Sequence, residues 1–212
     1  MNYLYIHTIM MISFAYILGS IPSGFILGKV LKKIDIRNYG SGNVGATNVF
    51  RVLGWKLGLT AFVFDMLKGL VSVIVARSFF PGYTYLILAS GITAIFGHIF
   101  SLFLKFKGGK GVATSAGVFI ALTPLASVIA IFVFIVTVII TRYVSAGSIL
   151  ASAALFTSQL IITINNGSGK IEYLVIIFIV AFFIIYKHKS NITRLMNGTE
   201  NRFTFSKKNR IV

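Results

Sequence analysis

The chain alternates long apolar runs with short segments rich in glycine and polar residues. A transmembrane helix needs about 20 predominantly apolar residues. Runs of that kind lie at 3–28, 57–76, 84–104, 144–164 and 171–187. No internal repeat and no low-complexity linker separates them. The pattern predicts one all-α polytopic membrane domain over 1–212.

A further apolar stretch, 111–141, carries no charged residue at all. At about 1.5 Å per residue it would form a helix of roughly 45 Å, whereas the hydrocarbon layer is about 30 Å thick. Thr123-Pro124 lies inside this stretch, and proline removes a backbone donor and disfavours helix continuation. We therefore expect two shorter membrane-embedded helices, 111–122 and 125–141.

The basic residues between the runs are unevenly distributed. Segments 29–56 and 105–110 and the tail from 187 are rich in Lys and Arg, whereas the connections 77–83 and 165–170 carry one basic residue each. The positive-inside rule places the rich segments in the cytoplasm. With 111–141 counted as a hairpin, this predicts about seven helices, an outside N-terminus, a cytoplasmic C-terminus, and glycine-rich cytoplasmic loops.

Composition narrows the class further. The chain is 57% hydrophobic and has a mean hydropathy of +0.91. Its 20 Lys and Arg against 4 Asp and Glu give a net charge of +16. This apolar content excludes a disordered chain or a soluble nucleic-acid binder. Cysteine is absent, and the acids are few: Asp35, Asp65, Glu172 and Glu200. We therefore expect no metal site and no cofactor.

Two polar features lie within the apolar runs. The segment 19–24, Gly-Ser-Ile-Pro-Ser-Gly, places Pro22 in the first run, which indicates a kink among residues small enough for close helix packing. Asp65 and Lys68 are three residues apart in the second run. Ionisable groups at such depth either neutralise each other or face a wet cavity, and both readings stay open.

The segment 40–48 matches G-x-G-x-x-G, the dinucleotide-binding pattern. That pattern carries its meaning only between a strand and a helix, so here the match is false. A glycine-rich loop that opens a helix still offers backbone amides and a positive dipole end to an anion. Ser41, Thr47 and Asn48 add donors, and Arg51 adds a guanidinium suited to phosphate. The competing reading is a surface loop with ordinary basic anchors.

The segment 105–115 carries a second anion-binding pattern after His98. Three lysines alternate with Gly108, Gly109 and Gly111 ahead of Thr114 and Ser115. It resembles the end of a P-loop but lacks the upstream glycine at the required spacing. A positive-inside anchor explains the lysines and leaves the glycines unexplained, so we favour phosphate binding.

Two further polar pieces lie at predicted cytoplasmic ends. One is 142–145, which includes Ser145, and the other is the basic tail 188–212. His188 and Asn191 share one helix face by their spacing. An amphipathic tail on an anionic membrane explains the lysines there and leaves the His–Asn pair unexplained.

Two anion loops on one membrane face indicate two phosphorylated ligands bound side by side. The H-x4-D pattern of common glycerolipid acyltransferases is absent, because Ile12, Phe103 and Thr193 stand five residues after the three histidines. No G-x-S-x-G nucleophile elbow is present. A transporter of organic phosphates is the competing class, since transporters also aim helix N-termini at anions. An anionic-lipid-binding scaffold is a third.

Five segments together resemble the bacterial acyl-phosphate:glycerol-3-phosphate acyltransferase family. They are GSIPSG (19–24), RNYGSGNVGATNVFRVLG (37–54), DMLKG (65–69), GHIFSLFLKFKGGKGVATSAG (97–117) and HKSNITRLMNGTENRF (188–203). The resemblance is collinear over nearly the whole chain, and the second and fourth segments are highly specific.

The resemblance implies acyl transfer from an acyl phosphate to the 1-hydroxyl of sn-glycerol 3-phosphate, which gives lysophosphatidate and phosphate in phospholipid synthesis. It implies that glycerol 3-phosphate is bound by Ser41, Arg51, Lys110, Ser145, His188 and Asn191, with Ser41, Arg51 and Lys110 catalytic. The donor phosphate would bind Thr47, Asn48, Gly108, Gly109, Lys110 and Gly111.

The resemblance also implies a multi-pass protein of the bacterial cytoplasmic (inner) membrane that works at its cytoplasmic face as a monomer. Its partners would be its two substrates, membrane lipid, an enzyme that makes acyl phosphate and a second acyltransferase, with no nucleic acid. An acyl phosphate is already activated, so no covalent enzyme intermediate is needed. With so few carboxylates, we expect a donor phosphate oxygen to take the hydroxyl proton.

Overall fold

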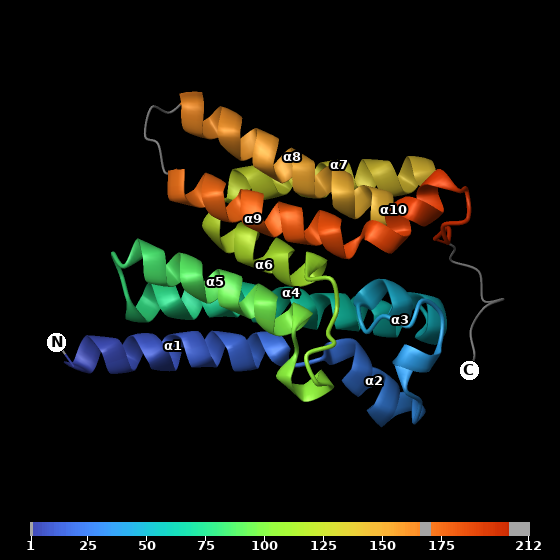
Figure 1. The fold of residues 1–212 in the computed structure, drawn as a ribbon, viewed down its shortest axis with the longest axis horizontal. Helices are drawn as coiled ribbons and strands as arrows, with labels where there is room; N and C mark the ends of the chain where they lie inside the picture. Colours follow the sequence, from blue (N-terminus) through green and yellow to red (C-terminus); the bar gives the residue numbers. More distant parts are fainter. Residues whose placement is uncertain (1, 166–170, 204–212) are drawn as a thin grey trace. The chain divides into compact units, whose positions relative to one another are not determined.

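The computed structural model describes residues 2–165 and 171–203. These residues form ten α-helices and two short 3-10 helices (Figure 1). The chain divides into two compact units, the first ending at Ala121 and the second beginning at Leu122. The prediction of a single domain over 1–212 stays a prediction.

The first unit contains six α-helices and both 3-10 helices. They are α1 (Asn2–Ser20), α2 (Ser23–Lys32), η1 (Ile36–Asn38), α3 (Ala46–Leu53), α4 (Trp55–Phe79), α5 (Thr84–Ile99), η2 (Leu102–Leu104) and α6 (Val112–Leu122). Within this unit α5 contacts both α1 and α4.

Glycines let the helices of the first unit approach closely. A Cβ on Gly19 of α1 would lie 2.2 Å from the Ala94 carbonyl oxygen of α5. Where α4 meets α6, a Cβ on Gly117 would lie 1.9 Å from the Met66 carbonyl oxygen, and one on Gly69 would lie 2.2 Å from that of Thr114. Small residues at helix crossings are typical of membrane proteins, because association there depends on packing rather than on expulsion of water.

The first apolar run is a broken helix rather than a straight one. It stops at Ser20, passes through Ile21-Pro22 and resumes as α2 at an angle of 45°. Pro22 supplies no backbone donor, so the helical ladder is interrupted there. The break that Pro22 predicted is confirmed, and it redirects the chain toward the first glycine-rich loop.

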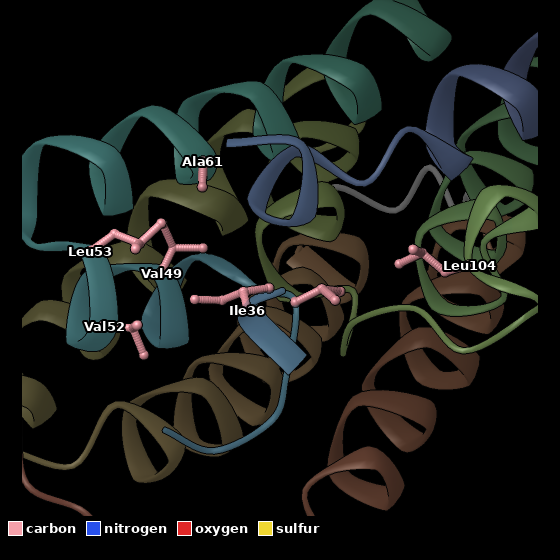
Figure 2. Packing of buried hydrophobic residues seen from close by; sticks show 7 residues of the cluster. Ile36, Val49, Val52, Leu53, Ala61 and Leu104 are labelled. Carbon is pink, nitrogen blue, oxygen red and sulfur yellow. The ribbon is translucent and has the colours of Figure 1, made fainter. Parts of the chain in front are cut away.

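A small apolar core holds that loop against α4. Its members come from η1, the loop, α3, α4 and η2: Ile36, Val44, Val49, Val52, Leu53, Ala61 and Leu104. Figure 2 shows Val49 and Leu53 of α3 facing Ala61 of α4. Because the buried residues of α3 recur at helical spacing, the helix has one apolar face.

The second unit contains four helices. They are α7 (Pro124–Thr141), α8 (Val144–Asn165), α9 (Ile171–Lys187) and α10 (Lys189–Met196). In Figure 1 these helices run side by side, with α8 contacting both α7 and α9. Pro124 occupies the first turn of α7, where its missing N–H costs no helical bond. The predicted division of 111–141 is therefore confirmed.

The spans follow the predicted order. Four helices, α4, α5, α7 and α8, are long and apolar enough to cross a membrane. The bent pairs α1–α2 and α9–α10 raise this to as many as six, and α6 is a shorter apolar helix. The all-helical polytopic fold is confirmed, and the direction in which the chain crosses the membrane stays a prediction.

The α4–α6 crossing generates a stability prediction. Gly117→Ala places a Cβ against backbone atoms of α4, which cannot give way as a side chain could. We expect it to lower the free energy of unfolding by about 1–3 kcal/mol, the usual effect of overpacking. Thermal unfolding in detergent measures this, with Gly28→Ala as the control because its nearest neighbour lies at 3.3 Å. Equal melting temperatures for the two variants would contradict the close crossing.

Candidate active site

The first glycine-rich loop is organised around one buried amide. Asn48 is 1% exposed. Its Nδ2 donates to the carbonyl oxygens of Ile36 (3.2 Å), Tyr39 (3.0 Å) and Asn43 (2.8 Å), and its Oδ1 accepts from the Ser41 amide (2.8 Å). The side chain thus satisfies four backbone groups of the loop, and its role in the structure is to shape that loop.

The loop presents three of the predicted ligands around this amide. Ser41 lies at its exposed outer edge, between Gly40 and Gly42, whose φ angles of +62° and +72° favour glycine. Thr47 is exposed in the first turn of α3, and Arg51 is half-buried one turn further along. The first N–H groups of a helix have no partner within it, so the start of α3 suits an anion.

The second glycine-rich loop is fixed against the end of α5. The amides of Gly108 and Gly109 donate to the carbonyl oxygens of Ile99 (3.0 Å) and His98 (3.1 Å). Gly111 has a φ angle of +85° and leads directly into α6, and Lys110 before it is half-buried. The structure therefore commits the first two glycine amides to the protein and sets Lys110 and Gly111 at the start of α6.

A buried ionic network lies beside this loop. Lys68 Nζ lies 2.8 Å from Asp65 Oδ1 and donates to the Ile21 carbonyl oxygen at 2.9 Å. His98 Nδ1 lies 3.6 Å from the same Asp65 oxygen. All three side chains are at most 7% exposed. Asp65 and Lys68 do pair, as one reading of the sequence held, but His98 joins them and the Lys68 ammonium also holds the break between α1 and α2.

The network lines a narrow crevice. Its walls come from the helix break, the first loop, α4, α5 and the second loop, and include Ser20, Val44, Asp65, His98 and Gly108. Four of the five polar segments noted in the sequence therefore meet within the first unit.

In the second unit two of the three predicted ligands, Ser145 and Asn191, bond to one carboxylate. Glu200 Oε1 accepts from Ser145 Oγ at 2.9 Å and from Asn191 Nδ2 at 2.6 Å, and Oε2 accepts from Arg194 Nε at 2.7 Å. The Glu200 side chain is 6% exposed. One acidic residue after α10 thus joins the start of α8 to α10.

The segment after Glu200 contacts the connection between α7 and α8. The Phe203 amide donates to the Arg142 carbonyl oxygen at 2.7 Å, and the Arg202 guanidinium lies over the Tyr143 ring, 5.7 Å from its centroid. The tail was predicted as basic and cytoplasmic. Its described part packs against the connection between α7 and α8, while the lysines beyond 203 lie outside the described residues.

His188 lies at the junction of α9 and α10, next to this cluster in sequence. It is 3% exposed, and its Nδ1 lies 2.7 Å from the Ile184 carbonyl oxygen. A carbonyl oxygen only accepts, so the hydrogen bond requires the proton on Nδ1. The ring therefore has a defined orientation at the 56° bend between the two helices.

The hydrogen bonds around Glu200 change its titration. Partial burial raises the pKa of this carboxyl, but the bonds from Asn191, Arg194 and Ser145 outweigh that effect. The pKa of Glu200 consequently lies below its ordinary value of 4.5. The carboxylate is therefore ionised at neutral pH, as its three donors require.

The sequence indicated polar residues of this cluster but not the carboxylate that joins them. Ser145 and Asn191 were predicted as ligands without Glu200, their common partner. The scarcity of acids was the available signal: Glu200 is one of only four carboxylates in the sequence, and it lies nine residues after Asn191. His98 as a neighbour of Asp65 had no such signal, since the two lie on different helices.

The fold and the loops define a class: a multi-pass helical membrane protein with two glycine-rich loops that open helices beside basic residues. Residues 9–198 match the family model described as glycerol-3-phosphate acyltransferase. The glycerol-3-phosphate acyltransferase of Chlorobaculum tepidum is 44% identical over 225 aligned residues, which cover 92% of this chain and 96% of the relative. That of Chlorobium limicola is 42% identical, with 91% and 95% covered.

Solved structures agree. The fold is similar to the crystal structure of PlsY (YgiH), an integral membrane glycerol 3-phosphate acyltransferase, in its glycerol 3-phosphate form, with a TM-score of 0.86 and 38% identity over 93% of this chain and 96% of that one. The lysophosphatidic acid form of PlsY gives 0.84 and 37%, with 94% and 96% covered. The chain belongs to the glycerol-3-phosphate acyltransferase family and is an integral membrane enzyme of that kind.

The role of Asn48 generates a prediction. Asn48→Asp keeps the shape but turns a carboxylate toward three carbonyl oxygens, whereas Asn48→Ala leaves those groups unpaired without repulsion. We expect both substitutions to lower the free energy of unfolding. The loss should be about 1–3 kcal/mol for Asn48→Ala and larger for Asn48→Asp. Thermal unfolding ranks them. An Asn48→Asp protein as stable as wild type would refute the role of Asn48 in shaping the loop and would favour a role in ligand binding.

Glu200 generates a pH prediction. Because its folded pKa lies below 4.5, its stabilisation is present above that pH and is lost as the pH falls through the folded pKa. We expect Glu200→Gln to lower the free energy of unfolding by about 2 kcal/mol at pH 7, since bonds to a charged acceptor are lost. The difference from wild type should shrink below pH 4.5. Glu172→Gln, in the first turn of α9, is the matched control. A difference that is constant across this pH range would contradict the ionised carboxylate.

Proposed function

We propose that this enzyme transfers a fatty acyl group from an acyl phosphate to the 1-hydroxyl of sn-glycerol 3-phosphate and releases lysophosphatidate and phosphate. The observation that carries the proposal is the pair of glycine-rich loops in the first unit, each opening a helix next to a half-buried cation, Arg51 or Lys110. The glycerol 3-phosphate and lysophosphatidic acid forms of PlsY support this substrate and this product.

The two phosphates would use different parts of these loops. Glycerol 3-phosphate would bind Ser41, Arg51 and Lys110 of the first unit. For Ser145, His188 and Asn191 the same role is what the family resemblance implies. The donor phosphate would bind Thr47, Lys110 and the start of α6 at Gly111. Because their polar groups bond within the protein, Asn48, Gly108 and Gly109 would serve the donor site by fixing the two loops.

The chemistry needs charge neutralisation and alignment more than covalent catalysis. The acceptor hydroxyl attacks the acyl carbon, a new ester C–O bond forms, and the anhydride C–O bond to phosphate breaks. The cations Arg51 and Lys110 would reduce the repulsion between two phosphates and stabilise the negative charge of the transition state. A donor phosphate oxygen would take the hydroxyl proton, and the protonated phosphate would leave as inorganic phosphate.

The proposal includes the membrane in which the enzyme works and its orientation there. We place the enzyme in the bacterial cytoplasmic membrane, with an outside N-terminus, a cytoplasmic C-terminus and its loops at the cytoplasmic face. The positive-inside distribution of Lys and Arg supports this orientation. It would work as a single-domain monomer between an enzyme that produces acyl phosphate and a second acyltransferase that consumes lysophosphatidate. No metal or cofactor enters the proposed reaction.

The test is acyl transfer by the purified protein in lipid, with palmitoyl phosphate, radiolabelled glycerol 3-phosphate, and neither CoA nor added metal. We expect lysophosphatidate and phosphate in a one-to-one ratio. Arg51→Ala and Lys110→Ala should each lower kcat/KM at least about 100-fold, because each leaves phosphate charge unpaired in a partly desolvated site. Lys110→Arg should also have a low kcat/KM, because the planar guanidinium group does not replace the compact ammonium charge in a tight glycine turn.

Lys56→Ala is the matched control, because Lys56 is an exposed lysine of the first unit that lies over the Trp55 ring. It should retain wild-type kinetics. Wild-type rates in Arg51→Ala or Lys110→Ala would refute the assigned site. A folded protein that binds the label but makes no product would refute the reaction and favour transport, which uptake into sealed vesicles would then reveal.

A further inference from the structure

Asp65, Lys68 and His98 take no part in the proposed chemistry, yet they are the most deeply buried ionisable groups of the first unit. Asp65 is 2% exposed, Lys68 4% and His98 7%. Placing ionisable groups within apolar spans is costly, so such groups usually carry a function. Neutralising each other explains Asp65 and Lys68, but it leaves the histidine unexplained.

His98 contacts the second glycine-rich loop through both its backbone and its ring. Its carbonyl oxygen accepts from the Gly109 amide at 3.1 Å. Its ring covers the same residue: a Cβ on Gly109 would lie 2.2 Å from His98 Nε2, and the next two atoms it would meet also belong to that ring. Gly109 does not adopt a left-handed conformation, so the imidazole, and not the backbone, is what requires glycine there.

The other nitrogen of the same ring is near the carboxylate of Asp65. His98 Nδ1 lies 3.6 Å from Asp65 Oδ1, so the ring is next to the carboxylate at a separation longer than a hydrogen bond. Lys68 Nζ lies 2.8 Å from that oxygen and also donates to the Ile21 carbonyl oxygen. Asp65 is thus held from the side of the helix break, and the imidazole is held between Asp65 and Gly109.

We infer that Asp65 is a positioning residue for the acyl transfer: through the imidazole of His98 it sets the place of the Gly108–Gly111 loop and so of Lys110. The chain of contacts runs from the Asp65 carboxylate to the His98 ring, from the ring to Gly109, and from Gly109 to the neighbouring lysine. A shift of about 1 Å in a binding group is enough to cost about 100-fold in rate. The inference rests on the proposed function in that it takes Lys110 to bind a substrate phosphate.

A double-mutant cycle between His98 and Gly109 tests the central contact. Gly109→Ala should push the loop off the ring and lower kcat/KM at least about 100-fold. His98→Ala alone should cost about 10-fold, and it should also remove the obstacle, so that His98→Ala/Gly109→Ala is no worse than His98→Ala. Independent sites would instead give additive losses. Additive losses in the folded double variant would overturn the inference.

Gly108 provides the matched control. A Cβ there would meet the His98 carbonyl oxygen at 2.0 Å and the Ile99 carbonyl oxygen at 2.9 Å, both of which belong to the backbone. His98→Ala therefore should not rescue Gly108→Ala. Rescue of both glycine variants would mean that loss of the ring loosens the loop in general, and it would overturn the specific contact.

The role of Asp65 is tested by Asp65→Asn with separate KM values for the two substrates. We expect the KM for palmitoyl phosphate to rise at least about 10-fold in protein whose folded fraction is matched to wild type by circular dichroism. Asp65→Asn and His98→Ala should be non-additive. Asp35→Asn, which removes a carboxylate paired with Arg37 at the surface, should keep wild-type values.

The outcomes separate the inference from the proposed function. A rise in the KM for glycerol 3-phosphate alone would support the positioning role and refute our assignment of the donor phosphate to this loop. A lower melting temperature with unchanged KM and kcat would overturn the positioning role. If Asp65→Asn does not fold, the His98–Gly109 cycle still decides the matter, because it leaves the carboxylate in place.

Discussion

A helix that breaks inside an apolar layer exposes backbone groups that only the protein can satisfy, and this constraint organises the first unit. In hydrocarbon each unsatisfied group costs several kcal/mol. At the break between α1 and α2, Lys68 donates to the Ile21 carbonyl oxygen and Ser101 donates to that of Ser20. At the far end of α6, Arg77 donates to the Ala121 carbonyl oxygen at 2.8 Å. Lys68 and Arg77 are therefore explained first by the breaks they serve.

The breaks in turn serve the loops. An unbroken first helix would carry the chain straight on, whereas the 45° bend at Pro22 brings Gly24 against the Val44 carbonyl oxygen of the first glycine-rich loop. The second loop is fixed in the same way, because its glycine amides use the last carbonyl groups of α5. The second loop thus pairs the last carbonyl groups of the helix before it, and each of the two loops then begins a new helix.

The second unit applies the same principle with a charge. Glu200 gathers donors from the start of α8 and from α10, and Phe203 then bonds to the residue that ends α7. An ionised carboxylate is the strongest acceptor available for such a junction, and hydrogen bonds to it are worth more than neutral ones. In this way one acid joins the start of α8 to α10, which lie far apart in the sequence.

Much of the fold followed from patterns that act over short distances. Apolar runs of about 20 residues predict spans, and Pro22 and Pro124 predict breaks, because a missing N–H interrupts a helix wherever it stands. The two anion loops were recognisable because glycine and cations occur together within a few residues. Ser145 came from the family resemblance, since no local pattern marks a lone serine, whereas the spacing of His188 and Asn191 already placed them on one helix face.

What the sequence by itself determined is therefore the order of the apolar helices, the places where they break, and the grouping of glycines with cations in the two loops. Only the tertiary structure decided which polar groups meet. It gave Asn48 to the backbone of its own loop, Glu200 to Ser145 and Asn191, and His98 to both Asp65 and Gly109. The reason is physical: helix propensity and burial in lipid act locally along the chain, whereas partners for buried polar groups are chosen by helix packing, which brings together residues with no regular spacing.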